Sequence, residues 1–226
     1  MKALLLENIH SEAVRALEGR GYQVELRSGA LGEAELADAL EGVELLGIRS
    51  RTHITGTVLK AHPQLLAVGA FCIGTNQIDL PAAAAAGVAV FNAPYSNTRS
   101  VVELALGEII TMARRLGDKN ASMHAGIWDK SANGSHEVRG RTLGIVGYGN
   151  IGSQLSVLAE AMGMKVYFYD VVDRLALGNA TRVDSMQELF ETCETISLHV
   201  DGRASNARLI GEREFAQMRP RTLFLI

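Results

Sequence analysis

The sequence has few cysteines, no excess of one charge and no long apolar run, and each of these absences excludes a class of protein. Its two cysteines, Cys72 and Cys193, are too few and too far apart for a disulfide framework or a metal site. The 22 basic and 25 acidic residues leave a net charge of −3, which gives no sign of a nucleic-acid partner. The apolar start at residues 3–6 is too short for a signal peptide, and no stretch could span a bilayer. We therefore expect a cytoplasmic protein without metal, nucleic-acid or membrane partners.

Strand and helix patterns alternate along the first part of the chain. Nearly half of the 226 residues are apolar, which is enough for a real core in one or two domains. The predicted strands are 2–7, 22–26, 45–49, 65–71 and 88–91, and the predicted helices are 11–20, 33–41, 55–60 and 79–86. Such alternation predicts a parallel sheet that is covered by helices on both faces.

A long helical stretch over 99–126 separates this first unit from a second one, and residues 127–140 read as a loop. The second unit again alternates, and a capping-box pattern at residues 185–188 opens one of its helices. Its predicted strands are 141–146, 165–169, 195–200 and 222–226. The fold class is therefore α/β with two domains, residues 1–98 and 99–226.

The most informative segment is the turn Gly147-Tyr148-Gly149-Asn150-Ile151-Gly152, which joins an apolar strand to a helix. The first glycine permits the sharp turn, the second lets the backbone approach a pyrophosphate, and the third lets helix and strand pack closely. The helix N-terminus offers N–H groups to phosphates. Asp170 ends the next strand, near the spacing of an acid that accepts ribose hydroxyls and repels a 2′-phosphate. The pattern therefore predicts NAD rather than NADP as the cofactor.

Blander interpretations stay open for each part of this pattern. Glycines also mark ordinary turns, and Asp170 could be a solvated strand end. His199, at the end of the strand over 195–200, could line the cofactor site or be a satisfied core histidine. The dinucleotide interpretation is favoured because strand, turn, helix, second strand and terminal acid all occur in register.

Polar residues follow three strands of the first unit. Ligands of α/β sheets bind at the carboxyl ends of the strands, which is where these residues lie. Arg49-Ser50-Arg51-Thr52 follows the third strand, and an extended backbone would put the two arginines on one side. Guanidinium groups suit carboxylate and phosphate oxygens. A turn with Gly74 follows the fourth strand, and residues 92–99 follow the fifth. A solvated loop, a plain turn and an interdomain linker are the alternatives, but three such ends at one edge favour a pocket.

Together, the segments 49–52, 71–76, 91–101 and 147–152 closely resemble the D-isomer-specific 2-hydroxyacid dehydrogenase family along the whole chain. The resemblance implies a flavodoxin-like substrate domain followed by a Rossmann-like NAD-binding domain. It implies that substrate is bound by Arg49, Ser50, Arg51, Gly74 and Asn97. It implies that NAD is bound by Asn150, Ile151 and Asp170 beside the glycine turn, with Val101 and His199 nearby.

The activity implied by this resemblance is oxidation of the 2-hydroxyl of a phosphorylated acid, 3-phosphoglycerate, by NAD at the start of serine synthesis. The family's catalytic arginine, glutamate and histidine would lie beyond Ile226, so no catalytic residue is assigned. We therefore expect a truncated portion that is inactive alone, that lacks the return segment of the substrate domain, and whose whole protein forms a homo-oligomer. The alternatives are a dehydrogenase of another D-2-hydroxy acid and a non-catalytic NAD-binding regulatory module.

Overall fold

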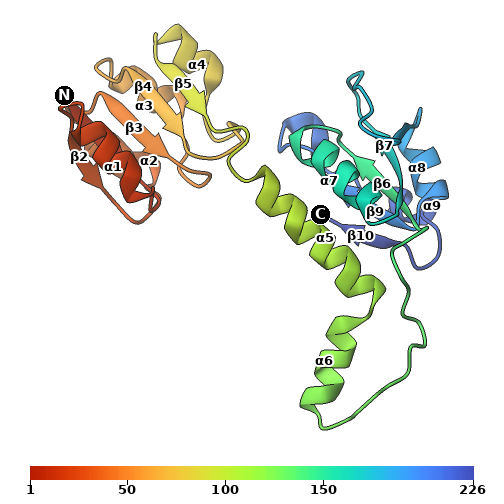
Figure 1. Ribbon diagram of the computed structural model, residues 1–226. Coiled ribbons are helices and arrows are strands. Elements are labelled where there is room, and N and C mark those ends of the chain that lie inside the picture. Colours follow the sequence, from red (N-terminus) through yellow and green to blue (C-terminus); the bar gives the residue numbers. More distant parts are fainter. The chain divides into compact units, whose positions relative to one another are not determined.

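The structure is a computed structural model that describes residues 1–226. Its internal contacts divide the chain into two compact units, Met1–Ser96 and Asn97–Ile226, each built on a five-stranded sheet (Figure 1). The α/β class predicted from the sequence is confirmed. None of the helices is both long and apolar enough to cross a bilayer.

The first unit has its strands in the order β2-β1-β3-β4-β5, and every neighbouring pair is parallel. This is the flavodoxin-like order, in which the direction of winding reverses between the first and third strands. The strands are β1 Lys2–Leu5, β2 Gln23–Leu26, β3 Leu45–Ile48, β4 Ala67–Ala70 and β5 Ala89–Asn92. The helices are α1 Ser11–Glu18, α2 Glu33–Ala39, α3 Gly56–Ala61 and α4 Leu80–Ala85.

One face of this sheet carries nearly all of the unit's core. Helices α2, α3 and α4 contribute Leu36, Leu59 and Ala83 to a buried cluster with side chains of β1, β3 and β4. The prediction that helices cover both faces is wrong for β4 and β5. Helix α1 contacts β2, and Phe71 and Phe91 stay 42% and 65% exposed. The strand pattern predicted the parallel sheet, but coverage of a face depends on which elements the unit contains.

The second unit has the strand order β10-β9-β6-β7-β8, again all parallel. Counted from β6, this is the dinucleotide-binding order 3-2-1-4-5, with its switch point between β6 and β9. The strands are β6 Thr142–Val146, β7 Lys165–Tyr169, β8 Thr181–Arg182, β9 Thr195–Leu198 and β10 Leu223–Leu225. The helices are α5 Thr98–Ala113, α6 Leu116–His124, α7 Asn150–Ala161, α8 Met186–Thr192 and α9 Glu212–Gln217.

Apolar side chains cover both faces of this second sheet, as its near-continuous apolar strands require. Leu143 and Ile145 of β6 join the cluster beneath α5 and α7, whereas Val146 joins the cluster beneath α8. The two clusters alternate along β6 because successive strand residues point to opposite faces. This packing fixes β6, and with it the turn that follows.

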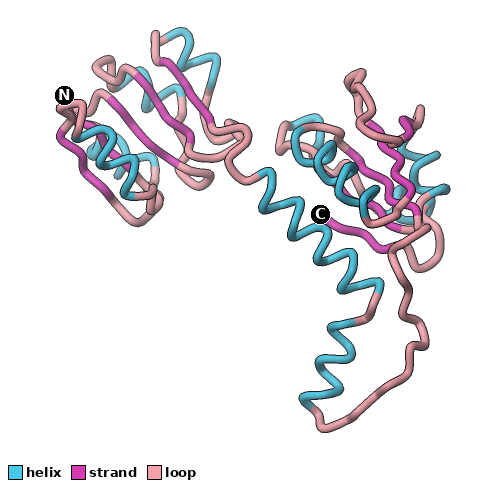
Figure 2. Tube along the Cα trace, viewed as in Figure 1, coloured by secondary structure: helices cyan, strands magenta, loops and turns pink.

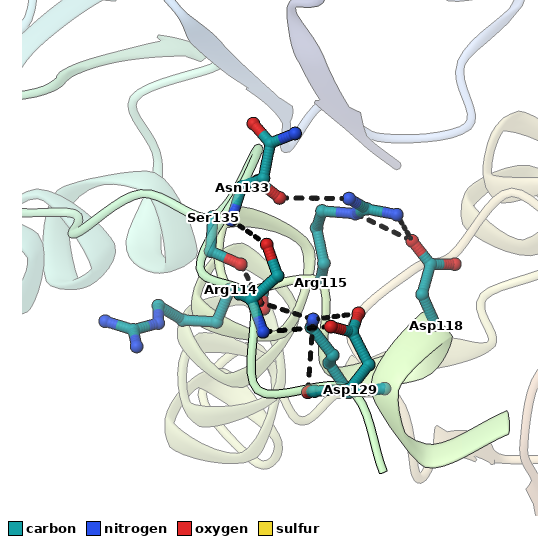
Figure 3. Close-up of polar contacts among 8 residues, drawn as sticks. Arg114, Arg115, Asp118, Asp129, Asn133 and Ser135 are labelled. Carbon is teal, nitrogen blue, oxygen red and sulfur yellow. Dashed lines mark hydrogen bonds and ion pairs between the residues drawn. The ribbon is translucent and has the colours of Figure 1, made fainter. Parts of the chain in front are cut away.

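The long helical stretch predicted over 99–126 is confirmed, but it consists of two helices, because the helix breaks at Arg114 and Arg115. Arg115 has a left-handed backbone (φ 55°), which ends α5 before α6 begins. Its guanidinium group donates hydrogen bonds to the carboxylate of Asp118 and to the carbonyl oxygen of Asn133 (Figure 3). The Ser135 hydroxyl donates a hydrogen bond to the Arg114 carbonyl oxygen. These contacts tie the break to the long segment that Figure 2 shows as loop between α6 and β6. The break lies at an arginine rather than at either neighbouring glycine, so no propensity argument would find it.

Short elements were also missed. Strand β8 has only two residues, and a single 3₁₀ turn forms at Ala204–Asn206. The capping box at 185–188 is half confirmed: the Ser185 hydroxyl accepts the Glu188 N–H, but the Glu188 carboxylate accepts the N–H of Asp184. Elements this short depend on their neighbours in the sheet more than on local pattern.

Candidate functional site

The three glycines of the turn after β6 meet different surroundings. Gly147 has φ +91°, and a Cβ there would lie 2.5 Å from the His199 carbonyl oxygen. A Cβ on Gly152 would overlap the carbonyl oxygen of Gly147 and lie 3.0 Å from Ile145 Cγ2. A Cβ on Gly149 would meet no atom of the chain within 4 Å. The chain itself therefore requires glycine at 147 and 152, whereas only something outside the chain would require it at 149.

A hollow of about 370 Å³ opens beside Gly149. Helix α7 begins there with Gly149 as its N-cap, so no side chain of the cap residue satisfies the first N–H groups. The hollow is lined by Tyr148, Gly149, Asn150, Ser153, Arg174, Leu175 and Leu177. A helix N-terminus, an arginine and apolar walls together suit an anionic group joined to a flat apolar one.

Two predicted residues of the turn pack against the core, although Tyr148 also lines one side of the hollow. Tyr148 is 3% exposed, stacks on Phe168 with ring centroids 3.7 Å apart, and its hydroxyl lies 2.7 Å from Ser156 Oγ. Ile151 packs against the cluster beneath α5 and α7. Both side chains therefore hold the turn in place.

Asp170 connects the end of β7 to the glycine turn. Its Oδ2 accepts the N–H of Tyr148 at 2.8 Å, and its Oδ1 accepts the N–H of Val172 at 2.9 Å. Arg174 Nε lies 3.8 Å from Asp170 Oδ2. Asp170 does not itself line the hollow, but Tyr148 and Arg174 do. Since a carboxylate can accept about four hydrogen bonds, each oxygen keeps capacity for a ligand hydroxyl.

His199 follows β9, directly across the switch point from Gly147. Its backbone N–H donates to the Val146 carbonyl oxygen at 2.8 Å. Its ring nitrogen Nε2 lies 2.8 Å from Ser197 Oγ. Burial lowers the pKa of His199 from 6.5 to about 4, so the ring is neutral at physiological pH. His199 does not line the hollow, and its neutral, hydrogen-bonded imidazole is a weak proton acceptor.

This pKa shift predicts a loss of stability in acid. Between about pH 6.5 and about pH 4 the unfolded chain takes up a proton on His199 that the folded chain does not, so the free energy of unfolding falls as the pH falls. We expect His199 to contribute a decrease of about 1–3 kcal/mol over this range. Denaturant unfolding of wild type and His199→Gln at several pH values measures it. The difference between the two should change across this range, and parallel curves would contradict the assignment.

In the first unit, Arg49, Ser50 and Arg51 are exposed directly after β3. Ser50 and Arg51 form a bend, so the expectation of an extended segment is wrong. The backbone N–H groups of Arg49, Arg51 and Thr52 all donate to the carboxylate of Glu7, which the sequence patterns did not single out. Neither guanidinium group forms an ion pair within the chain. Both therefore keep an uncompensated positive charge beside a fixed backbone.

Three other residues predicted from the sequence do not line the hollow. The Gly74 carbonyl oxygen lies 3.3 Å from Gln77 Nε2, in the turn after β4. Asn97 is the N-cap of α5 and belongs to the second unit, although the sequence put it in the first domain. Val101 is half-buried in the first turn of α5 and does not line the hollow.

Comparisons with known proteins agree with this geometry. The chain is 51% identical over 220 residues to D-3-phosphoglycerate dehydrogenase of Haemophilus influenzae, which covers 97% of this chain and 54% of that protein. The chain thus spans about half the length of the curated relatives it matches. The crystal structure of TT0316 protein from Thermus thermophilus has a TM-score of 0.88 at 27% identity, over 97% of this chain and 71% of that one.

A further solved structure shares the fold alone. D-lactate dehydrogenase from Aquifex aeolicus, complexed with NAD and lactic acid, has a TM-score of 0.86 at 23% identity, over 99% of this chain and 67% of that one. The sequence profile described as "D-isomer specific 2-hydroxyacid dehydrogenase, catalytic domain" matches residues 3–210. The strand order of both sheets, the glycine turn and this match lead to one conclusion: the chain belongs to the D-isomer-specific 2-hydroxyacid dehydrogenase family.

Proposed function

We propose that residues 1–226 are the substrate- and NAD-binding portion of an NAD-dependent D-3-phosphoglycerate dehydrogenase. Such an enzyme oxidises the 2-hydroxyl of 3-phosphoglycerate to a ketone, giving 3-phosphohydroxypyruvate for serine synthesis. The observation that carries the proposal is the open space at Gly149, between the N-terminus of α7 and the hollow. The names of the relatives at about half identity support the choice of substrate.

The residues around the hollow fit a nicotinamide dinucleotide. The backbone at Gly149 and Asn150, with the N-terminus of α7, would hold the pyrophosphate, and Asp170 would accept the ribose hydroxyls. Bound NAD⁺ supplies an acceptor for the hydride that leaves carbon 2 of the substrate. The chain's own contribution is to bind and orient: Tyr148 and Phe168 fix the turn, and the backbone of His199 packs closely against Gly147.

Residues 1–98 would act as the substrate domain, and residues 99–226 as the NAD-binding domain. Arg49 and Arg51 would bind the carboxylate and phosphate of the substrate, because neither charge is neutralised within the chain. Ser50 and Gly74 would line the same pocket, and Asn97 is proposed as a further substrate-binding residue. We further propose that the whole protein is a cytoplasmic homo-oligomer whose acid–base residues lie outside residues 1–226.

We expect a polypeptide of residues 1–226 to bind NADH but not to oxidise 3-phosphoglycerate. Binding needs the glycine turn and Asp170, whereas turnover also needs a base for the hydroxyl proton, and the lowered pKa of His199 makes it a weak base for that step. Isothermal titration calorimetry with NADH, and the appearance of NADH absorbance with NAD⁺ and 3-phosphoglycerate, measure the two properties.

Turnover by this polypeptide alone would show that the chemistry lies within residues 1–226 and that the roles above are misassigned. Absence of NADH binding by folded protein would reject the cofactor proposal. In a longer protein from the same gene, rates with 3-phosphoglycerate, D-glycerate and D-lactate distinguish the phosphorylated substrate from another D-2-hydroxy acid. A gene that encodes no downstream arginine, glutamate and histidine would favour the non-catalytic NAD-binding module.

A further inference from the structure

A buried carboxylate stands at the switch point of the first sheet. Glu7 follows β1, which neighbours β3, and ligands of flavodoxin-like sheets bind between these two strands at their carboxyl ends. Glu7 is 6% exposed, and its backbone is left-handed (φ 60°), a conformation uncommon for a residue other than glycine. A charged residue in this position and conformation must be held by specific partners.

Those partners are backbone N–H groups of the segment after β3. Glu7 Oε1 accepts from Arg49 N at 3.1 Å and from Thr52 N at 2.9 Å, and Oε2 accepts from Arg51 N at 3.0 Å. Burial by itself would raise the pKa of Glu7, but the hydrogen bonds from Thr52, Arg51 and Arg49 outweigh burial and lower the pKa. The carboxylate is therefore ionised at neutral pH, and three charge-assisted hydrogen bonds hold the turn.

Gln77 extends this arrangement to the neighbouring strand end. It is 3% exposed, and its Nε2 donates to the Arg49 carbonyl oxygen at 2.8 Å and to the Gly74 carbonyl oxygen at 3.3 Å. The turn after β3 is thus held by Glu7 through its N–H groups and by Gln77 through a carbonyl oxygen. Gln77 also connects it to the turn after β4.

The negative charge of Glu7 is directed at backbone amides and not at the arginine side chains. No ion pair forms between Glu7 and either guanidinium group, so the charges of Arg49 and Arg51 remain available to an anion. Exposed amides could bond to water instead, and an apolar residue at position 7 would avoid the cost of burying a charge. The arrangement serves to hold the turn in one geometry.

We propose that Glu7 is a positioning residue, whose buried carboxylate fixes the turn Arg49–Thr52 so that Arg49 and Arg51 present their positive charges to the anionic groups of the substrate, with Gln77 as the second support. The inference rests on the proposed function, because it assumes that this turn meets the substrate. Glu7 would act on the turn and would not itself bind the substrate.

The test is Glu7→Gln in the full-length enzyme. The new amide keeps one acceptor oxygen but turns an N–H donor toward a backbone N–H, so the turn loses its geometry. We expect the KM for 3-phosphoglycerate to rise about tenfold or more, since small displacements of binding groups are costly. The KM for NAD⁺ and the dissociation constant of NADH should not change, because the cofactor binds to the second unit. Glu25→Gln is the matched control, because Glu25 lies in the same unit, pairs with Arg27 and Lys2, and belongs to β2, which does not neighbour β3 in the sheet.

A second readout does not depend on turnover. Amide hydrogen exchange of Arg49, Arg51 and Thr52 should become at least about tenfold faster in Glu7→Gln, while the amides of β3 keep their protection. Unchanged exchange and unchanged KM in a folded Glu7→Gln protein would overturn the inference. If Glu7→Gln does not fold, Gln77→Met decides instead, by a several-fold rise in the same KM or none. If the wild-type enzyme does not oxidise 3-phosphoglycerate, the proposed function is wrong, and the exchange comparison still decides whether Glu7 fixes the turn.

Discussion

Replacing Gly152 by alanine is expected to destabilise the second unit and to abolish NADH binding. The added Cβ would overlap the carbonyl oxygen of Gly147, which is backbone and cannot rotate away, and would crowd Ile145. Overpacking of this kind costs about 3 kcal/mol, which lowers the Tm of a domain of this size by roughly 6–12 °C. Thermal unfolding followed by circular dichroism, with NADH calorimetry below the transition, measures both effects.

Two other glycine substitutions separate packing from ligand binding. At Gly149 a Cβ meets no atom of the chain within 4 Å, so Gly149→Ala should keep the Tm and lose about tenfold or more in NADH affinity. Gly107→Ala, on the exposed side of α5, should change neither property, apart from a small gain in helix stability. If Gly149→Ala bound NADH as tightly as wild type, no ligand would approach this turn closely.

Asp170→Ala is expected to reverse the preference between the two nicotinamide cofactors. Loss of the carboxylate removes the acceptor for the ribose hydroxyls and should weaken NADH binding about 100-fold, or about 2.7 kcal/mol. It also removes the repulsion of a 2′-phosphate, so NADPH binding should weaken far less than NADH binding and should improve relative to it. Calorimetric titration of the variant with each cofactor gives the two dissociation constants.

The comparison of cofactors is needed because Asp170 also has a structural role. Its carboxylate accepts the N–H groups of Tyr148 and Val172, and loss of these bonds alone would weaken both cofactors alike. Asp173→Ala is the matched control, since Asp173 lies in the same loop with its side chain 91% exposed and paired with Arg182. An equal loss for NADH and NADPH in Asp170→Ala would leave Asp170 as a support of the turn only.

The residues of the glycine turn illustrate how far sequence patterns reach. Spacing alone predicted strand, turn, helix and terminal acid, and the observed β6, α7, β7 and Asp170 follow in that order. The pattern could not tell that Tyr148 turns into the core and stacks on Phe168, because that contact joins β7 to the turn through tertiary packing. Nor could it tell that, of the three glycines in this turn, only Gly149 has room for a Cβ within the chain.

The first unit shows the same limit at another place. The arginines after β3 were predicted as an anion-binding group from their chemistry and their place at a strand end. Glu7 was not, since 42 residues separate it from Arg49, and no local pattern marks a carboxylate that bonds distant backbone amides. A charged residue at the end of a buried apolar strand was the one signal that could have indicated it.

By itself, the order of apolar runs, glycines and strand-end polar residues determined the α/β class, the parallel sheets and the place of the glycine turn, because periodicity and turn chemistry are local properties of the chain. Only the tertiary structure decided which side chains face the hollow, that α5 and α6 separate at Arg115, and that Glu7 holds the turn Arg49–Thr52. These features depend on contacts between residues far apart in sequence. Their geometry follows from the packing of whole elements, which no local pattern encodes.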